Sequence, residues 1–391
     1  MRDIKNLIYL DHAATTPMDP QVIRAVREYE EKWYGNPATL YELGTKSEQA
    51  VEEARAKVAS VLGCRPEEVY FTSGGTESDN WAVKGVAFSH QKKGKHLVTS
   101  QAEHHAVLDT CKFMERIGWE VTYVPVDSTG TVDPQDVRKA IRPDTVLVSI
   151  MHANNEVGTV EPVAEIGKIA REHDVLFHTD AVQTVGKVPV NVDKLGCDLL
   201  SLTGHKFYGP KGVGAMYLRR GVRIERHMHG GAQERNRRAG THNVPGIVGL
   251  GKAIELASAD MDAEARRLTE LADRLKNGLL ERIPDVRYNG HSSRRLPGNV
   301  HICVEGIEGE AMLLCLDVEG VCCSSGSACT TGSLDPSHVL LAMGIPAEVA
   351  HGSVRFTLGR ENTTEQIDRV LEVFPGIVKK LRAMSPIYHK S

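Results

Sequence analysis

Helical and strand-like patterns alternate along the chain from about residue 47 to residue 250, with short glycine- or proline-containing connections between them. Ser47 is expected to cap a helix that ends at Gly63, and the strand-like run VYFTS follows it. Asp133-Pro134 opens another short helix, which precedes the run TVLVSIM. Repeated units of one helix and one strand predict an α/β fold, in which helices cover both faces of a parallel sheet.

A second, smaller lobe is expected after this region. One or two long helices lie between Pro245 and Ile283 and lead the chain out of the first lobe. The segment beyond them contains two strand-like runs, NVHICV and SVRFTL, and helical patterns near 309–318, 337–343 and 364–383. This mixture of strands and helices predicts an α+β lobe.

Composition and charge narrow the class of partner. The 391 residues include 47 basic and 51 acidic side chains that are mixed along the chain, so no surface for nucleic acid or an anionic membrane is expected. The expected partner is a small-molecule substrate. The chain has no run of about 20 apolar residues and its N-terminus lacks the order of a signal peptide, which predicts a cytoplasmic protein.

The cysteines and one unusual stretch point to thiol chemistry. Eight cysteines without a CxxC pair or regular spacing fit reduced thiols better than a disulfide framework. The spacing of Cys322, Cys323 and Cys329 is not that of a zinc site. The stretch Ser324–Ser333, SSGSACTTGS, is too rich in serine, glycine and threonine to pack as a helix or strand. It is expected to be an exposed, mobile loop that carries Cys329.

The first two strands of interest end in residues suited to binding a planar phosphorylated ligand. In a parallel sheet, ligands bind beyond the carboxyl ends of the strands. VYFTS leads into Gly74-Gly75-Thr76, where glycines and the start of a helix suit a phosphate, although an ordinary turn would look the same. HLVTS leads to His104, whose imidazole suits stacking or proton transfer but equally suits a structural role.

Two further strands end in a carboxylate and a lysine. VLFHT ends at Asp180, with Gln183 one turn later; this carboxylate either bonds a protonated ring nitrogen or caps a helix. DLLSLT leads to His205-Lys206, and this lysine either forms a Schiff base or lies on the surface. A phosphate cradle, a carboxylate and a lysine at successive strand ends together describe a site for pyridoxal 5′-phosphate.

The motifs TSGGTESDN, HTDAVQ, SLTGHKFYGPKGVG, RRAGTHN and SSGSACTTGS resemble those of cysteine desulfurases of the NifS/IscS type, and the resemblance covers essentially the whole chain. It implies the α/β fold of fold-type I transferases that depend on pyridoxal 5′-phosphate, with a mainly parallel seven-stranded sheet in the large domain. That domain would span 15–262. Residues 1–14 and 263–391 would form the smaller α+β domain, which carries the catalytic loop 324–334.

The same resemblance implies a role for each site residue. Lys206 would bind the cofactor, Asp180 would pair with its pyridine nitrogen, and His104 would stack on its ring. The residues implied in contacts with the ring substituents are Asn155 and Gln183, and those implied in holding the phosphate are Gly75, Thr76, Thr203 and His205. Thr241, in RAGTHN, would reach the phosphate across the interface of a two-fold homodimer.

The activity implied is the removal of sulfur from L-cysteine. Arg355, in SVRFTLG, would bind the substrate carboxylate with the help of Asn36 and Asn155. Cys329 would take the sulfur as a persulfide, His104 would carry a proton, and L-alanine would leave. The sulfur would pass to an acceptor, such as a U-type scaffold protein of iron–sulfur cluster assembly. No firm metal site is predicted, although some relatives bind an iron–sulfur cluster transiently through the cysteine that matches Cys329.

Two other functions stay open, and two segments differ from the family pattern. The first alternative is a class-V aminotransferase or a cysteine- or selenocysteine-type lyase without persulfide transfer, and the second is a non-catalytic docking platform. The chain has Asp11-His12-Ala13-Ala14 where the family often has Asn-Asn before Ala-Thr-Thr, and 38–41 read ATLY in place of an SSxH segment. These differences concern local detail of the site or interface.

Overall fold

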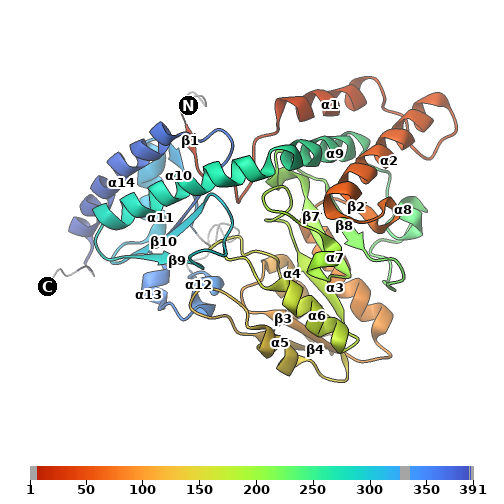
Figure 1. Ribbon diagram of the computed structural model, residues 1–391, viewed down its shortest axis with the longest axis horizontal. Helices are drawn as coiled ribbons and strands as arrows, with labels where there is room; N and C mark the ends of the chain where they lie inside the picture. The colour runs from red at the N-terminus through yellow and green to blue at the C-terminus, as the bar shows by residue number, and fades with distance from the viewer. Residues whose placement is uncertain (1–6, 326–334, 387, 389–391) are drawn as a thin grey trace.

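The computed structural model describes residues 7–325, 335–386 and 388, and Figure 1 shows two lobes joined by a long helix. The larger lobe is built on a seven-stranded sheet of order β2-β8-β7-β6-β5-β3-β4. β8 runs antiparallel to both of its neighbours, and the remaining pairs are parallel, which confirms the mainly parallel sheet. The strands are β2 (Val69–Thr72), β3 (His96–Ser100), β4 (Glu120–Val124), β5 (Thr145–Ser149), β6 (Leu176–Asp180), β7 (Leu199–Thr203) and β8 (Gly214–Leu218).

Helices cover both faces of this sheet. Neighbouring side chains on its strands point to opposite faces and pack into two different apolar clusters. Phe71 and Leu200 belong to one cluster, whereas Tyr70 and Leu199 belong to the other. The helices of this lobe are α1 (Pro20–Glu31), α2 (Glu42–Leu62), α3 (Gly75–His90), α4 (His105–Arg116), α5 (Pro134–Ala140), α6 (Val163–Glu172), α7 (Val192–Leu195), α8 (Gln233–Asn236) and α9 (Val244–Ala259), with 3₁₀ turns at Pro66–Glu68 and Gly204–Lys206.

One helix start differs from the prediction. Ser47 does not cap α2, which begins five residues earlier at Glu42; instead Ser47 is buried inside the helix and its hydroxyl donates to the carbonyl of Trp33 at 3.0 Å. The predicted end is correct, since Gly63 adopts a left-handed conformation with φ of 70°. A serine that can bond a carbonyl from another segment does not have to mark a helix terminus.

The smaller lobe contains an antiparallel sheet of order β12-β10-β9 and a separate parallel pair of β1 and β11. Of the one or two helices expected after Pro245, the structure has two, because the helix breaks at Asp260 between α9 and α10. α10 extends across Figure 1 into the smaller lobe. The elements of this lobe are β1 (Ile8–Tyr9), α10 (Met261–Arg282), β9 (Val286–Asn289), β10 (Asn299–Val304), α11 (Gly309–Val318), β11 (Val321–Cys322), α12 (His338–Ala342), α13 (Ala347–Ala350), β12 (Ser353–Thr357) and α14 (Thr364–Met384).

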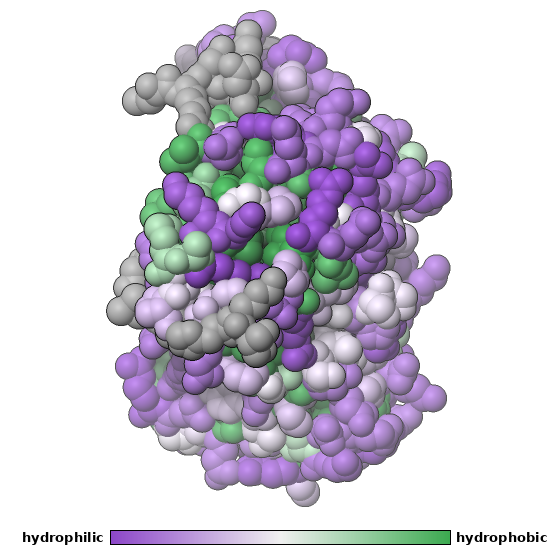
Figure 2. Space-filling model, turned by 90° about the vertical axis from the view of Figure 1, so that its left-hand side faces the viewer, coloured by the Kyte–Doolittle hydropathy of each residue, from purple (hydrophilic) through white to green (hydrophobic). Residues whose placement is uncertain are grey.

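The surface of the smaller lobe is mostly polar, with apolar areas between the polar side chains on the face drawn in Figure 2. Leu314 and Val318 on α11 are among the large apolar side chains that are exposed. In the part of the chain that the structure describes, no helix is both long and apolar enough to cross a membrane. The same residues contain no group of three or more histidines, cysteines or carboxylates that could hold a metal ion.

Candidate active site

A cavity of about 340 Å³ lies where the carboxyl ends of the parallel strands face the smaller lobe. β2, β3, β6 and β7 each end at its wall, and β12 contributes a residue from the other lobe. Ten of the thirteen residues predicted for the site line this cavity: Gly75, Thr76, His104, Asn155, Asp180, Gln183, Thr203, His205, Lys206 and Arg355. Most of the site residues predicted from the sequence therefore surround one cavity.

One end of the cavity is shaped for an anion. Helix α3 begins at Gly75, and its first backbone N–H groups have no partner within the helix. A side chain at Gly75 would place its Cβ 2.6 Å from Cγ2 of Val182, so only glycine leaves this space open. Thr76, Thr203 and His205 add polar side chains, and burial lowers the pKa of His205 to about 4, with the charge of Lys206 adding to the effect.

Asp180 supplies a buried carboxylate in the middle of the cavity. Its Oδ1 accepts a hydrogen bond from the backbone N–H of Val182 at 2.8 Å. Burial raises the pKa of Asp180 to about 6, while the backbone bond and the charge of Lys206 act in the opposite direction. A carboxylate in this environment is stabilised by a cationic partner, such as a protonated ring nitrogen.

Asp79 is a second carboxylate in this wall that the sequence argument missed. It is buried, and burial and the charge of Asp180 raise its pKa well above the usual range. Its Oδ1 has no hydrogen-bond partner among the described residues and lies 3.6 Å from Nε2 of His178. The sequence could have predicted its position, because Asp79 lies four residues after Gly75 and therefore on the same face of α3.

Lys206 lies in the turn directly after β7, and it faces the N-terminal segment across the cavity. Its Nζ donates hydrogen bonds to the carbonyl oxygens of Ala13 and Ala14, the latter at 2.7 Å. The neighbouring Gln183 donates from Nε2 to the same oxygen of Ala13 at 3.0 Å. The N-terminal segment therefore contributes backbone carbonyls that hold two of the predicted site residues.

His104 caps helix α4 and presents a neutral imidazole to the cavity. Its Nδ1 accepts a hydrogen bond from the backbone N–H of Ala106 at 3.1 Å. Burial, together with the charge of Lys206, lowers the pKa of His104 to about 4. Because Nδ1 is the acceptor, the single ring proton of the neutral form is on Nε2.

Arg355 extends from β12 and is buried, with 2% of the residue exposed. Its Nη1 donates to the carbonyl of Asn155 at 2.9 Å, and its Nη2 donates to Oδ1 of Asp11 at 2.9 Å. Its Nε is buried without a hydrogen-bond partner in the described part of the chain. Asp11 belongs to the segment that differs from the family pattern, and its carboxylate occupies one face of the guanidinium fork.

Two predicted residues lie away from this cavity, and a third lies outside the described residues. Asn36 is exposed between α1 and α2, where its Oδ1 accepts from the backbone N–H of Ala38 at 3.0 Å. Thr241 is exposed between α8 and α9. Cys329 and residues 326–334 of the predicted loop 324–334 lie outside the described residues. The chain before this loop is placed, because Ser324 pairs with Arg355 through two backbone hydrogen bonds of 3.2 and 2.6 Å.

Comparison with known proteins agrees with this geometry. The family described as "Aminotransferase class-V" matches residues 8–370. The chain is 57% identical over 383 residues to a "Cysteine desulfurase IscS" of Methanosarcina thermophila, covering 98% of this chain and 95% of that protein. The chain belongs to the cysteine desulfurases of the class-V aminotransferase family. The resemblance found in the sequence motifs is thus confirmed.

Solved structures place the fold in the same family. A "NIFS-LIKE PROTEIN" superposes with a TM-score of 0.91 at 39% identity, covering 96% of this chain and 100% of that one. A structure described as "SspA in complex with cysteine" superposes with a TM-score of 0.80 at 37% identity, covering 90% of this chain and 98% of that one. The predicted fold class, a fold-type I α/β transferase, is therefore confirmed.

Cysteine desulfurases depend on pyridoxal 5′-phosphate, and the residues of this cavity fit that cofactor. The cradle that a Cβ at Gly75 would fill suits a phosphate group. The buried carboxylates of Asp180 and Asp79, one of them with an unpartnered oxygen, suit a protonated pyridine nitrogen. Lys206 lies between these two features on the same sheet edge, which suits an aldehyde bound as a Schiff base.

Proposed function

We propose that this protein removes sulfur from L-cysteine, releases L-alanine and holds the sulfur as a persulfide on Cys329. The observation that carries the proposal is the full-length match to cysteine desulfurases together with a cavity that contains Lys206, Asp180 and Arg355. The cysteine named in the SspA structure supports L-cysteine as the substrate.

Different residues of the cavity are proposed to bind different parts of the cofactor. Pyridoxal 5′-phosphate, when bound, supplies an electron-withdrawing ring that weakens bonds at the substrate carbons. Lys206 would hold its aldehyde and Asp180 its ring nitrogen, while His104 would stack on the ring. Asn155 and Gln183 would contact the ring substituents. The phosphate would be held by Gly75, Thr76, Thr203 and His205, with Thr241 of a second copy.

Proton transfer is assigned to Lys206 and His104. The Nζ of Lys206 lies in the wall of the cavity between the N-terminal carbonyls and Asp180, where an amine can take and return protons at the substrate carbon. His104 stays neutral at physiological pH because burial lowers its pKa to about 4. Its proton at Nε2 is proposed to bond the substrate sulfur, and the neutral ring adds no second cation beside Lys206.

Sulfur transfer is assigned to Cys329. The thiolate of Cys329 attacks the sulfur of the bound cysteine, so that a sulfur–sulfur bond forms and the carbon–sulfur bond breaks. The electron pair of the broken bond stays with the carbon skeleton, which takes up a proton and leaves as L-alanine. The persulfide then passes its sulfur to an acceptor thiol.

Arg355 is proposed to bind the substrate carboxylate, assisted by Asn155 and Asn36. Arg355→Lys is expected to raise KM for L-cysteine about 10- to 100-fold with a smaller change in kcat, because one charged hydrogen bond and the planar fork are lost. Steady-state kinetics would measure this effect. Arg274→Lys is the matched control, since Arg274 holds the carboxylate of Asp368 through two bonds of 2.6 and 2.9 Å on the exposed surface. An unchanged KM in Arg355→Lys would contradict the assignment.

The wider organisation is proposed on the same basis. The large domain is proposed to span 15–262, and 1–14 with 263–391 to form the smaller domain carrying the loop 324–334. The exposed positions of Asn36 and Thr241 support a homodimer in which each copy completes the other's site. The sulfur acceptor is proposed to be a U-type scaffold protein of iron–sulfur cluster assembly, in the cytoplasm.

The direct test is an assay of the holoenzyme with L-cysteine and an excess of a thiol reductant. Equal amounts of L-alanine and sulfide are expected, because each persulfide is reduced after the amino acid has left. Without the reductant, alanine is expected to stop at about one equivalent per site, since the sulfur stays on the protein. Formation of a 2-oxo acid from L-cysteine without alanine would show a class-V aminotransferase or lyase and overturn the proposal.

A further inference from the structure

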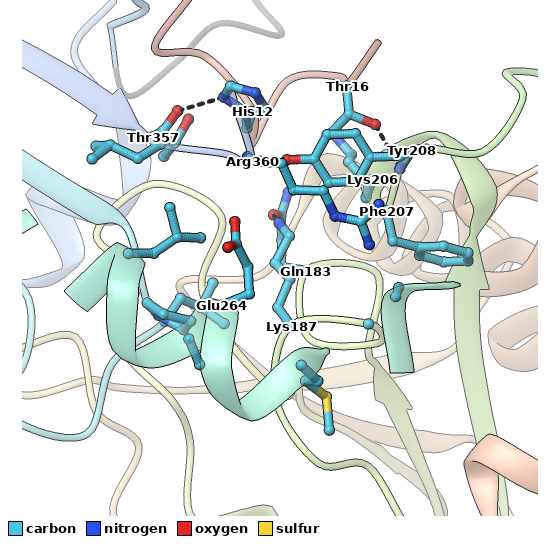
Figure 3. A pocket seen from close by; sticks show the side chains of 18 of the residues that line it. His12, Thr16, Gln183, Lys187, Lys206, Phe207, Tyr208, Glu264, Thr357 and Arg360 are labelled. Carbon is cyan, nitrogen blue, oxygen red and sulfur yellow. Dashed lines mark hydrogen bonds between the residues drawn. The ribbon is translucent and has the colours of Figure 1, made fainter. Parts of the chain in front are cut away.

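A second cavity lies behind the cofactor site, and a thin wall separates the two. It has a volume of about 170 Å³ and lies against the junction of α9 and α10 (Figure 3). Ala13, Gln183 and Lys206 line both cavities, so these three residues form the shared wall. Lys187 lines the second cavity only, and it is a lysine that the proposed mechanism does not use. Figure 3 shows Lys187 close to Gln183 in this view.

Lys187 bonds directly to the wall. Its Nζ donates to Oε1 of Gln183 at 3.0 Å, and Nε2 of the same amide donates to the carbonyl of Ala13 at 3.0 Å. The two residues come from one compact turn after β6, in which the backbone N–H of Lys187 bonds the carbonyl of Thr184 at 2.9 Å. Among the described residues no carboxylate forms an ion pair with Lys187, so Gln183 is the acceptor that the structure gives this side chain.

These contacts fix the orientation of the Gln183 amide. In the reverse orientation, the NH₂ group of Gln183 would face the N–H donors of Lys187, and its oxygen would face the carbonyl oxygen of Ala13. In this orientation Nε2 keeps a second hydrogen beyond the one donated to Ala13, and Gln183 lines the cofactor cavity as well as the second cavity. We propose that Lys187 is a positioning residue, which holds the Gln183 amide so that its N–H group faces the cofactor. This inference rests on the proposed cofactor contact of Gln183.

The role does not depend on a permanent charge on Lys187. Burial, together with the charges of Lys206 and Arg355, lowers the pKa of Lys187 to about 7. Both the ammonium and the amine can donate an N–H to Gln183. Replacement by a residue without a donor is therefore the change that removes the contact.

The test compares Lys187→Met, Lys187→Arg and Gln183→Ala in the full-length protein. Lys187→Met keeps the length of the side chain but has no donor, and it is expected to raise the dissociation constant of pyridoxal 5′-phosphate, measured by titrating the apoprotein, about three- to tenfold. The visible absorption band of the bound cofactor is expected to shift its pH dependence. Lys187→Arg is expected to restore most of both properties, because it keeps N–H donors.

Lys84→Met is the matched control. Lys84 is another lysine that donates to an amide four residues earlier, to Oδ1 of Asn80 at 2.7 Å, and burial also lowers its pKa. This control lies outside the residues that line either cavity, and it is expected to leave cofactor affinity and the absorption band unchanged.

The double variant distinguishes positioning from general destabilisation. In a Gln183→Ala background, Lys187→Met is expected to cause little further change in cofactor affinity, because the amide that it positions is gone. Fully additive effects, or an unaltered absorption band in Lys187→Met, would overturn the inference. Failure of the proposed function would look different, since the wild-type protein itself would then bind no cofactor or form no alanine.

Discussion

Replacement of Cys329 by alanine is expected to reduce formation of alanine and sulfide from L-cysteine by about 10³-fold or more, while cofactor binding stays as in the wild type. The thiolate of Cys329 is the group proposed to attack the substrate sulfur, and alanine has no nucleophile to take its place. The substrate should still bind at Arg355 and react as far as its carbon–sulfur bond. Alanine is quantified by chromatography, sulfide by a colour reaction, and cofactor content by absorption.

Burial raises the thiol pKa of five other cysteines. Burial raises the pKa of Cys111 and Cys197 to about 12 and that of Cys303 to about 11, so these thiols stay protonated at neutral pH. Burial is also the main cause that raises the pKa of Cys64 to about 12 and the pKa of Cys323 above its usual range. A protonated, buried thiol is a poor nucleophile. Burial therefore argues against these five cysteines as sulfur carriers.

Cys315→Ala and Cys322→Ala are the matched controls, because both cysteines are partly exposed in the smaller lobe. Each is expected to keep desulfuration within about twofold of the wild type. Mass spectrometry after a single turnover without reductant should find one added sulfur atom on the wild type and both controls, and none on Cys329→Ala. Wild-type rates in Cys329→Ala would mean that another group carries the sulfur, and the aminotransferase or lyase function would then be favoured.

The sequence was most informative where a site residue follows directly from a strand. The carboxyl ends of parallel strands meet at one edge of a sheet, so Asp180 at the end of β6 and Lys206 after β7 had to lie close together once the strands were recognised. The glycines at the start of a predicted helix likewise indicated the position of the anion cradle. Local patterns sufficed here because neighbouring strands fix the distances between their ends.

Contacts between distant segments were not predictable by this route. Nothing in the N-terminal segment indicates that Asp11 would bond Arg355, 344 residues later in the chain, or that the carbonyl of Ala13 would accept from both Gln183 and Lys206. These bonds depend on how the smaller lobe packs against the larger sheet. Local patterns indicate still less about Asn36 and Thr241, because the proposed contacts of these residues involve a second copy of the chain.

Lys206→Ala is expected to remove covalent attachment of pyridoxal 5′-phosphate and to reduce desulfuration by about 10³-fold or more. The loss has two physical sources. The variant has no amine to hold the cofactor aldehyde, and it lacks the amine beside the carbonyls of Ala13 and Ala14 that is proposed to carry protons. Asp180 and the cradle at Gly75 remain, so cofactor should still bind non-covalently and more weakly.

Borohydride reduction followed by denaturation and mass spectrometry measures the covalent link directly. Reduced wild-type protein should keep the cofactor on the peptide that contains Lys206, and Lys206→Ala should lose it on denaturation. Lys168→Ala, at an exposed position of α6, is the control and should behave as the wild type in both assays. If reduced Lys206→Ala still carried the cofactor covalently, another lysine would be the attachment site. Lys187 would then be the first candidate, because its Nζ bonds Gln183 in the wall between the two cavities and because burial lowers its pKa to about 7.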